Sequence, residues 1–263
     1  MLLEGKIAIV TGAARGTGAA ICRRFLDEGA TVVVSDVLLD EGRARAEKLG
    51  PRASFAPLDV TDTTAWTRVV DQTISDHGRI DVLVNNAGIL HLGSIANTTI
   101  DDFRRVFDVN AAGAFAGIAA VAPHMSRAQS GSIINIASLD ALQGMNGLSA
   151  YTTSKWAMRG LTHASAVELG RAGIRVNSIC PAGGNPGMYG PWATQLMEMG
   201  PAIGAYTDKR AIPREATPDE IARVAVFLAS DLSVMVTGTD IPVDGGHIAG
   251  DYVEGFDRLD SDS

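Results

Sequence analysis

The fold is decided by Thr11-Gly12-Ala13-Ala14-Arg15-Gly16-Thr17-Gly18, a glycine-rich segment between an apolar run at 6–10 and an amphipathic stretch at 16–28. The three glycines permit a tight turn, a close approach of the backbone to a pyrophosphate, and close packing of a helix on a strand. The start of the following helix presents free N–H groups and a positive dipole end, which favour phosphate. The G-x-x-x-G-x-G spacing differs from G-x-G-x-x-G. Its place between strand and helix nevertheless predicts a dinucleotide-binding turn made by Gly12, Arg15, Gly16, Thr17 and Gly18.

Apolar runs rich in Val and Ile alternate with longer amphipathic stretches along the rest of the chain. We predict buried parallel strands at 6–10, 31–35, 53–58, 80–84, 132–137, 175–179 and 239–243. Helices are predicted at 16–28, 40–49, 62–77, 99–127, 150–169 and 218–229, with Asp62 and Thr217 as N-caps. This alternation predicts an α/β fold: one doubly wound parallel sheet of the Rossmann type, with about seven strands and helices on both faces.

One domain is predicted over residues 1–263, because no linker or change of composition divides the chain. Residues 183–212 interrupt the strand–helix rhythm and are rich in Gly, Pro and Met, which predicts a mobile substrate flap. Residues 250–263 are acidic and are predicted to form a C-terminal tail.

The composition excludes several classes of partner. The chain has 46% hydrophobic and 20% charged residues and a net charge of −8, which argues against nucleic-acid or membrane partners. Cys22 and Cys180 are predicted to be core residues rather than a disulfide, and no His, Cys or acidic cluster has metal-ligand spacing. No signal-peptide layout and no run of about 18 apolar residues occurs, so we expect a cytoplasmic protein.

Asp36 ends the second predicted strand, downstream of the glycine turn. A carboxylate at this point can accept hydrogen bonds from a ribose 2′-hydroxyl and would repel a 2′-phosphate. The next residues, Val37 and Leu38, offer no cation, and Arg15 is the one basic residue nearby. The alternative is a surface Asp in a turn. We predict that the cofactor is NAD rather than NADP.

Tyr151 and Lys155 are four residues apart on a predicted helix, so their side chains share one face. A phenol with a pKa of about 10 is a poor base at neutral pH, but a nearby cation favours the phenolate and lowers that pKa. Ser138 follows a predicted strand at the edge of the sheet where such folds bind ligands. A Tyr and a Lys on one side of an amphipathic helix, or a serine in a turn, also occur by chance. The Tyr–Lys pair therefore indicates a catalytic site only in combination with Ser138 and the glycine turn.

Four stretches together resemble the one-domain form of the short-chain dehydrogenase/reductase family, over about residues 5–247. They are the glycine turn, Asn85-Asn86-Ala87-Gly88, Ser138 with Tyr151-Thr152-Thr153-Ser154-Lys155, and Val243-Asp244-Gly245-Gly246. Within that family, Trp156 and Arg159-Gly160-Leu161 after the Tyr–Lys pair are similar to bacterial hydroxysteroid dehydrogenases of the 3α,20β type.

The resemblance implies a role for each catalytic residue. Tyr151 would exchange a proton with the substrate oxygen, which Ser138 would hold, while a hydride moves between substrate and cofactor. Lys155 would bind the nicotinamide ribose, and Asn110 would order a water that links Lys155 to solvent. Read from the residues alone, Asn110 is also a helix-distorting amide bonded to the backbone. The resemblance further implies a homotetramer formed through 99–127 and 150–169.

The resemblance also extends the cofactor site. Asp59 and Val60 would lie beside the adenine ring, and Asn86, Ala87 and Gly88 would let the backbone approach the cofactor, with Asn86 mainly structural. After the sixth strand the family usually has Pro-Gly and a Thr that anchors the nicotinamide carboxamide. This chain departs from that pattern with Pro181-Ala182-Gly183-Gly184-Asn185-Pro186-Gly187-Met188. We expect Pro181, the backbone of Gly183 or Gly184, or the Asn185 side chain to take that part, and Asn185→Ala to raise KM for NAD.

The candidate substrate pocket is apolar. It is predicted to be lined by Leu90, Leu139, Leu142, Met145, Leu148, Met188 and Trp192. No Arg or Lys occurs in the flap before Lys209, which argues against a carboxylate or phosphate substrate. These features favour a steroid, terpenoid or other alicyclic secondary alcohol or ketone. The alternative is that these residues form an oligomer interface or pack the flap on itself.

Two other functions compete with an NAD-dependent alcohol dehydrogenase. An NADPH-dependent ketoacyl reductase would want basic residues near Val37, whereas the chain has Asp36 and an acidic composition. A non-catalytic NAD-binding sensor would have lost the Tyr or the Lys, and both are present.

Overall fold

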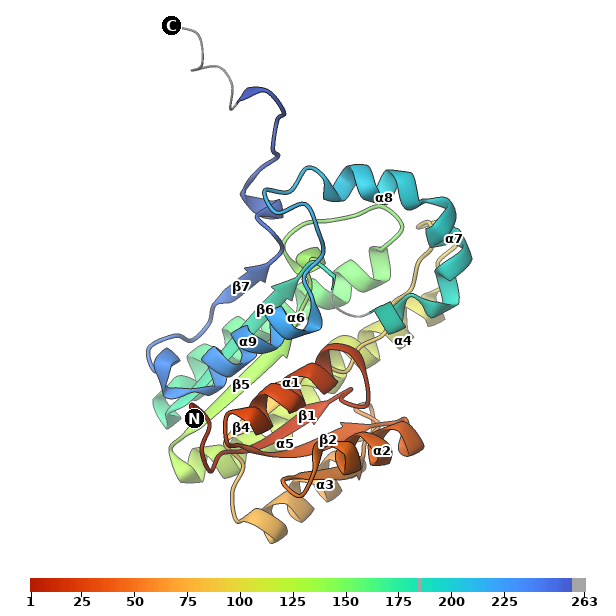
Figure 1. Cartoon of the computed structure of the whole chain (residues 1–263). Helices are drawn as coiled ribbons and strands as arrows, with labels where there is room; N and C mark the ends of the chain where they lie inside the picture. Colours follow the sequence, from red (N-terminus) through yellow and green to blue (C-terminus); the bar gives the residue numbers. More distant parts are fainter. Residues whose placement is uncertain (184–185, 257–263) are drawn as a thin grey trace, which may run out of the picture.

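The computed structural model describes residues 1–183 and 186–256, and these contain one seven-stranded sheet in the order β3-β2-β1-β4-β5-β6-β7 (Figure 1). Every neighbouring pair is parallel. The strands are β1 Ile7–Thr11, β2 Thr31–Asp36, β3 Ala53–Pro57, β4 Val82–Asn85, β5 Gly131–Ile136, β6 Ile174–Pro181 and β7 Asp240–Val243. The predicted doubly wound sheet is confirmed. Its order reverses between β1 and β4, and ligands of such sheets bind beyond the carboxyl ends of the strands at this reversal.

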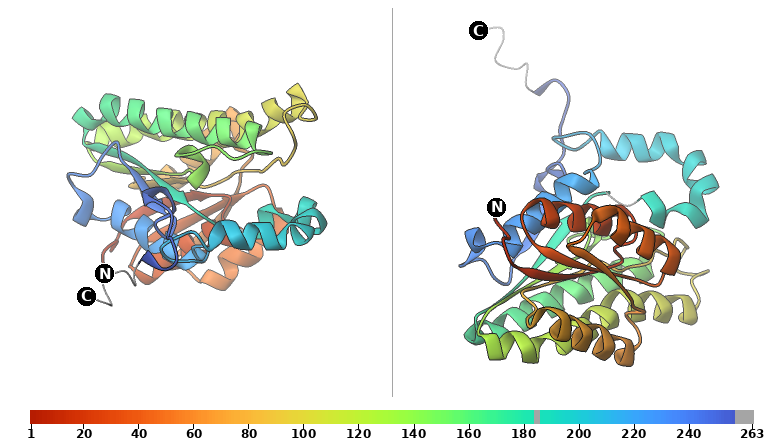
Figure 2. Two further views of the ribbon diagram at one scale, coloured as in Figure 1. Left: turned by 90° about the horizontal axis from the view of Figure 1, so that it is seen from above. Right: turned by 60° about the horizontal axis from the view of Figure 1, so that its bottom comes forward.

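Helices cover both faces of the sheet in two layers (Figure 2). One face carries α1 Gly16–Asp27, α2 Leu39–Leu49 and α9 Pro218–Ala229. The other carries α3 Thr63–His77, α5 Gly113–Ala128 and α6 Ser149–Leu169, and α4 Ile100–Phe107 precedes α5. Short 3₁₀ turns are η2 Leu139–Ala141, η3 Gly170–Ala172, η4 Pro186–Met188, η5 Gly190–Trp192, η6 Asp231–Ser233 and η7 His247–Ala249.

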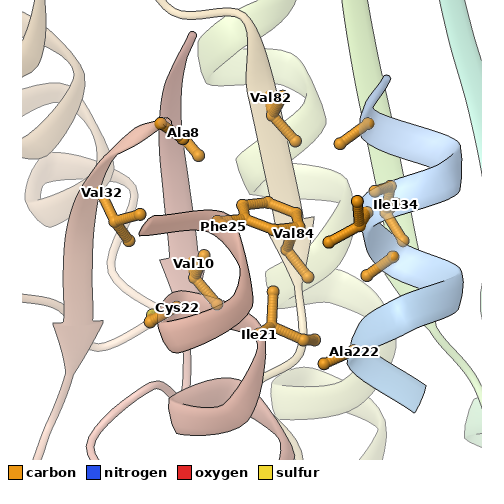
Figure 3. Close-up of a cluster of buried hydrophobic side chains, with 14 of the residues drawn as sticks. Ala8, Val10, Ile21, Cys22, Phe25, Val32, Val82, Val84, Ile134 and Ala222 are labelled. Atoms are coloured by element: carbon orange, nitrogen blue, oxygen red, sulfur yellow. The ribbon is translucent and has the colours of Figure 1, made fainter. Parts of the chain in front are cut away.

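A hydrophobic core fills each space between sheet and helices. On the first face, Phe25 of α1 is fully buried among strand residues such as Val10 and Val84, and Ala222 of α9 closes the cluster (Figure 3). On the second face Trp66 of α3 takes the corresponding place. The small residues of α1 and α9 allow these helices to pack closely against each other.

Cys22 and Cys180 are buried and free, each within the part of the chain that the structure describes, so their predicted place in the core is confirmed. The predicted caps are confirmed as well. The Asp62 side chain accepts from the Thr64 N–H, and Thr217 forms a capping box with Glu220.

The predicted helix at 99–127 is confirmed as a continuous helical segment, in which a π-turn, η1 Asp108–Ala112, joins α4 to α5. The flap contains two helices that the sequence did not predict, α7 Ala193–Glu198 and α8 Gly200–Thr207, which project beyond the sheet (Figure 1). Among the described residues, the segment Ile100–Ala128 is long and apolar enough by composition to cross a membrane. Its residues Ile118, Val121 and Met125 pack in the second core cluster.

Candidate active site

The glycine turn lies where β1 and β4 end side by side. Gly12 has φ +60°, and a Cβ at this position would lie 2.8 Å from the Ala87 Cα. A Cβ at Gly18 would lie 2.4 Å from the Gly12 carbonyl oxygen. Asn86 donates from Nδ2 to the carbonyls of Thr11 and Gly12, each at 2.9 Å, which agrees with its expected structural part. The turn therefore requires glycine and is locked to the end of β4.

Asp36 is a buried carboxylate held in one orientation at the end of β2. Its Oδ2 accepts from the Ala14 N–H and its Oδ1 from the Leu38 N–H, both at 3.0 Å. The Ala14 bond ties it to the glycine turn. Val37 beside it is 58% exposed and Arg15 points to solvent. A carboxylate oxygen has two lone pairs, so Asp36 can accept a further hydrogen bond from a ribose hydroxyl.

The expected adenine residues differ in burial. Asp59 is exposed, and its Oδ1 accepts from the backbone and hydroxyl of Thr61 at 2.9 and 2.7 Å. Val60 is buried, and a Cβ at Gly113 would come within 2.6 Å of its side chain. Val60 therefore packs into the protein, and its carbonyl accepts from Trp66 Nε1 at 3.1 Å.

Tyr151 and Lys155 lie one turn apart on α6, as predicted. The Lys155 Nζ is 5.5 Å from the centre of the Tyr151 ring and donates to the Ile136 carbonyl at 2.9 Å. Burial lowers the pKa of Lys155 to about 8, because the charged form loses its hydration. A Cβ on Gly88 would lie 3.6 Å from Nζ, so the end of β4 reaches the lysine.

The prediction that Lys155 lowers the Tyr151 pKa was wrong for the protein alone. Burial is the largest influence and raises the pKa of this phenol well above its usual range, while a hydrogen bond with Ser138 lowers it by less. The Asp140 charge also raises it. The phenol loses its hydration because the ring lies in a hydrophobic cluster with Leu90 and Leu148.

Ser138 stands between Tyr151 and a carboxylate that the sequence reasoning missed. Its Oγ accepts from the Asp140 N–H and donates to Asp140 Oδ2, both at 3.1 Å. Burial raises the pKa of Asp140. The signal that could have found Asp140 is an acid two positions after a serine at the carboxyl edge of β5, because a serine there can cap a turn by accepting from the N–H of that acid, as Ser138 does for η2.

Asn110 is fully buried in the π-turn between α4 and α5. Its Oδ1 accepts from the Ile89 N–H at 2.8 Å, and its Nδ2 donates to the Ile89 carbonyl at 3.0 Å and to Ser154 Oγ at 2.9 Å. The structure therefore shows the helix-distorting amide. A Cβ on Gly88 would lie 3.3 Å from Asn110 Oδ1 and 3.6 Å from Lys155 Nζ, so Asn110 also lies close to Lys155.

The segment after β6 is only partly described. Ala182 follows Pro181 and is paired on both sides, with its N–H donating to Val243 and its carbonyl accepting from Ala216. Gly183 has φ +100°, and a Cβ there would come within 2.6 Å of the Glu215 side chain. Gly184 and Asn185 lie outside the described residues, so the prediction for Asn185→Ala stays a prediction.

Part of the predicted pocket gathers around Tyr151. The residues that pack with it in one cluster include Leu90, Leu148, Met188, Trp192 and Tyr189, the last of which the sequence reasoning missed. Trp192 also contacts the edge of His91, with ring centres 6.3 Å apart. Leu142 is partly buried and packs against a different cluster, with Met158 and Cys180, so its place in the pocket stays a prediction. Leu139 is buried outside these clusters, and Met145 is 36% exposed.

Comparison with known proteins agrees with this geometry. A family model described as enoyl-(acyl carrier protein) reductase matches residues 12–247. The chain belongs to the short-chain dehydrogenase/reductase family. The 3-alpha-(or 20-beta)-hydroxysteroid dehydrogenase of Mycobacterium bovis is 44% identical to this short-chain dehydrogenase/reductase, over 94% of this chain and 91% of the relative.

Two other relatives of this short-chain dehydrogenase/reductase cover nearly its whole length. The trans-4-hydroxycyclohexanecarboxylate dehydrogenase of Sinomonas cyclohexanicum is 40% identical over 93% of each chain. The cyclopentanol dehydrogenase of Comamonas testosteroni is 37% identical over 94% of this chain and 98% of the relative. The protein is therefore an oxidoreductase of a family that generally uses NAD(P)H, and the resemblance inferred from the motifs is confirmed.

Proposed function

We propose that this short-chain dehydrogenase/reductase interconverts a hydrophobic alicyclic secondary alcohol and its ketone with NAD(H). The observation that carries the proposal is that Ser138, Tyr151 and Lys155 meet at the sheet edge that also holds the glycine turn. Ser138, Tyr151 and Lys155 are therefore placed to act on one small ligand bound beyond the carboxyl ends of β1, β4 and β5.

The chain's own residues handle the proton. A bound nicotinamide supplies or accepts the hydride at the substrate carbon. Tyr151 exchanges the proton of the substrate oxygen, and Ser138 positions that oxygen through its hydrogen bond with the phenol. Because burial raises the Tyr151 pKa, the phenol is protonated at neutral pH and ready to donate to a carbonyl oxygen. Taking a proton from an alcohol becomes easier as the pH rises.

The preference for NAD rests on Asp36. The residues of the glycine turn fit a pyrophosphate, because the start of α1 presents free N–H groups and a positive dipole end to an anion. Asp36 is fixed against the same turn by the Ala14 N–H. Its charge would oppose the 2′-phosphate of NADP.

The cluster around Tyr151 supports an apolar, ring-shaped substrate. Leu90 and Leu148 lie on one side, and Met188, Tyr189 and Trp192 approach from the flap. The names of the relatives, which include hydroxysteroid, hydroxycyclohexanecarboxylate and cyclopentanol dehydrogenases, are those of enzymes for cyclic secondary alcohols. We therefore favour steroid, terpenoid or small alicyclic alcohols.

A spectrophotometric assay tests the proposal. Cyclohexanol, cyclopentanol and a hydroxysteroid are each incubated with the enzyme and either NAD or NADP. Formation of NADH or NADPH is followed by absorbance. We expect turnover with NAD and a loss in Tyr151→Phe of about 10²- to 10⁴-fold in kcat, since the proton acceptor is gone. Tyr252→Phe, at a half-exposed tyrosine, is the control and should keep wild-type activity.

Two outcomes would replace the proposal. Activity confined to NADPH and a β-ketoacyl thioester would assign a ketoacyl reductase. Tight NAD binding with no turnover of any alcohol would assign a sensor. The homotetramer and the cytoplasmic location expected from the sequence remain part of the proposal.

A further inference from the structure

Ala14 lies within the glycine turn and is held by a hydrogen bond at each end. Its N–H donates to Asp36 Oδ2, and its carbonyl accepts a hydrogen bond from Nε of Arg45, both at 3.0 Å. Ala14 is buried, so these two backbone groups have lost water and depend on their protein partners. Arg45 and Asp36 are therefore linked through a single residue, although they lie on different elements of the chain.

Arg45 reaches Ala14 from α2, the helix that directly follows β2. A Cβ on Gly42 would collide with the ring of Phe55, so glycine is what lets α2 pack this closely on β3. The N–H of the residue just before α2 donates to Oδ1 of Asp36 at 3.0 Å. The packing of α2 thus fixes the base of the Arg45 side chain and also one of the two bonds that orient Asp36.

The Arg45 guanidinium has no acidic partner of its own. Among the described residues it forms no ion pair, and Asp219, which lines the same groove, is bound by Arg24 and Arg223. That groove has a volume of about 340 Å³. The hydrogen bond to Ala14 therefore decides where the Arg45 side chain lies. Because the side chain borders a groove, substituting it removes no residue from the hydrophobic core.

We infer that Arg45 is a positioning residue for the adenosine ribose of the cofactor. Its bond to the Ala14 carbonyl keeps the Ala14 N–H aimed at Asp36, and the carboxylate then presents a fixed acceptor to the 2′-hydroxyl. Without Arg45, Ala14 is held at one end only, and the carboxylate loses this preorganisation. The inference rests on the proposed function, because it takes the ribose of NAD as the group that Asp36 binds.

Two nucleotides that differ by one hydroxyl test the inference. ADP carries a pyrophosphate and the ribose, and 2′-deoxy-ADP lacks only the hydroxyl that Asp36 would bind. Each is titrated into the whole chain by calorimetry, and the ratio of the two dissociation constants is taken. We expect wild type to bind ADP about tenfold more tightly, as one hydrogen bond to a charged group implies, and Arg45→Met to reduce this preference to about twofold.

Further variants separate the hydrogen bond from the charge and from general effects on α2. In Arg45→Gln the amide nitrogen takes the place of Nε and can donate to the Ala14 carbonyl, so the preference for ADP should return to nearly its wild-type value. Arg45→Leu is a second variant that lacks the donor. Arg43→Met removes an exposed arginine of the same helix, which pairs with Asp40 at 3.9 Å, and should change neither affinity.

Steady-state kinetics provide an independent measurement. Arg45→Met should raise KM for NAD about tenfold and leave kcat within about twofold of wild type, because Tyr151 and Lys155 lie on α6 and do not contact Arg45. A fall in kcat as large as the rise in KM would contradict a role confined to the ribose.

The outcomes distinguish the inference from the proposed function. Equal losses of affinity for ADP and 2′-deoxy-ADP in Arg45→Met would overturn the inference, because Arg45 would then support the turn and not the carboxylate. An Arg45→Gln variant that behaves like Arg45→Met would overturn it as well, since the Nε bond would not be the cause. A wild-type protein that binds both nucleotides equally would instead overturn the contact of Asp36 with the ribose, and with it the preference for NAD in the proposed function.

Discussion

The ammonium group of Lys155 is buried, and burial disfavours its charge. The free energy of unfolding therefore depends on pH. Its pKa falls from 10.5 in the unfolded chain to about 8 in the folded protein, a difference of about 3 kcal/mol. Between these values the unfolded chain binds more protons, so stability rises with pH over this range. Below pH 8 the folded protein bears the full cost of the buried ammonium group.

We expect wild type to gain about 2 kcal/mol of unfolding free energy between pH 8 and pH 10, relative to Lys155→Met. Urea unfolding of both proteins at each pH measures this gain. The comparison removes the pH dependence that arises from groups present in both proteins. One of these is Tyr151, whose raised pKa makes stability fall as the pH rises above 10. A constant difference between the two proteins would show that the lysine is solvated.

Asp36 should decide between the two cofactors. Replacing its carboxylate in Asp36→Asn removes the charge that opposes a 2′-phosphate and weakens the bond to a ribose hydroxyl. We expect the ratio of kcat/KM with NAD to that with NADP to fall by about tenfold or more. Asp40→Asn, at an exposed site on α2, should leave the ratio unchanged. Equal effects of the two substitutions would remove Asp36 from the cofactor site.

Single residues were predictable where chemistry depends on spacing along the chain. Tyr151 and Lys155 share a helix face because they are four apart, and Gly12 and Gly18 are needed because the backbone turns there. The Tyr151 pKa was not predictable, because it depends on burial by residues distant in sequence. Asp140 was missed because its bond to Ser138 is visible only once η2 has formed.

Among the elements, the π-turn at Asp108–Ala112 joins the long helical segment to the end of β4. Asn110 makes three hydrogen bonds there, two to Ile89 and one to Ser154. We expect Asn110→Ala to cost about 3 kcal/mol in urea unfolding, since three buried bonds are lost. Because Gly88 lies between Asn110 and Lys155, kcat should fall more than KM rises.

The exposed Asn97→Ala serves as the control for that substitution, and neither stability nor kcat should change. A variant at Asn110 that loses stability with an unaltered kcat would confine this residue to a structural part.

The helices and strands were predictable because the spacing of apolar residues along the sequence shows which face of each element is buried. The seven strands and the core helices lie within a few residues of the predicted ranges in the described part of the chain. The helix distortion at Asn110 was expected, but its backbone partner was not, because Ile89 lies 21 residues away in the sequence. The helices α7 and α8 were missed because they are short and bury no complete face, and because α8 contains Gly and Pro.

At the scale of the whole molecule, the outer surface of the α5 and α6 layer is unusually apolar. Phe115 is 60% exposed and Val167 is 84% exposed, and Trp156 on α6 is also exposed. Exposed aromatic and β-branched side chains on neighbouring helices favour association. This surface coincides with the helices through which the family resemblance implies a homotetramer.

We expect light scattering after gel filtration to give about 110 kDa, four times the 27.5 kDa chain. The double variant Phe115→Lys and Val167→Lys places charges on both helices and should shift the mass toward dimer or monomer, since like charges would meet across a symmetric contact. Lysines at the exposed Leu232 and Val234, near η6, probe a different surface. If those lysines dissociate the oligomer and the first pair does not, the contact lies at the β7 end of the sheet instead.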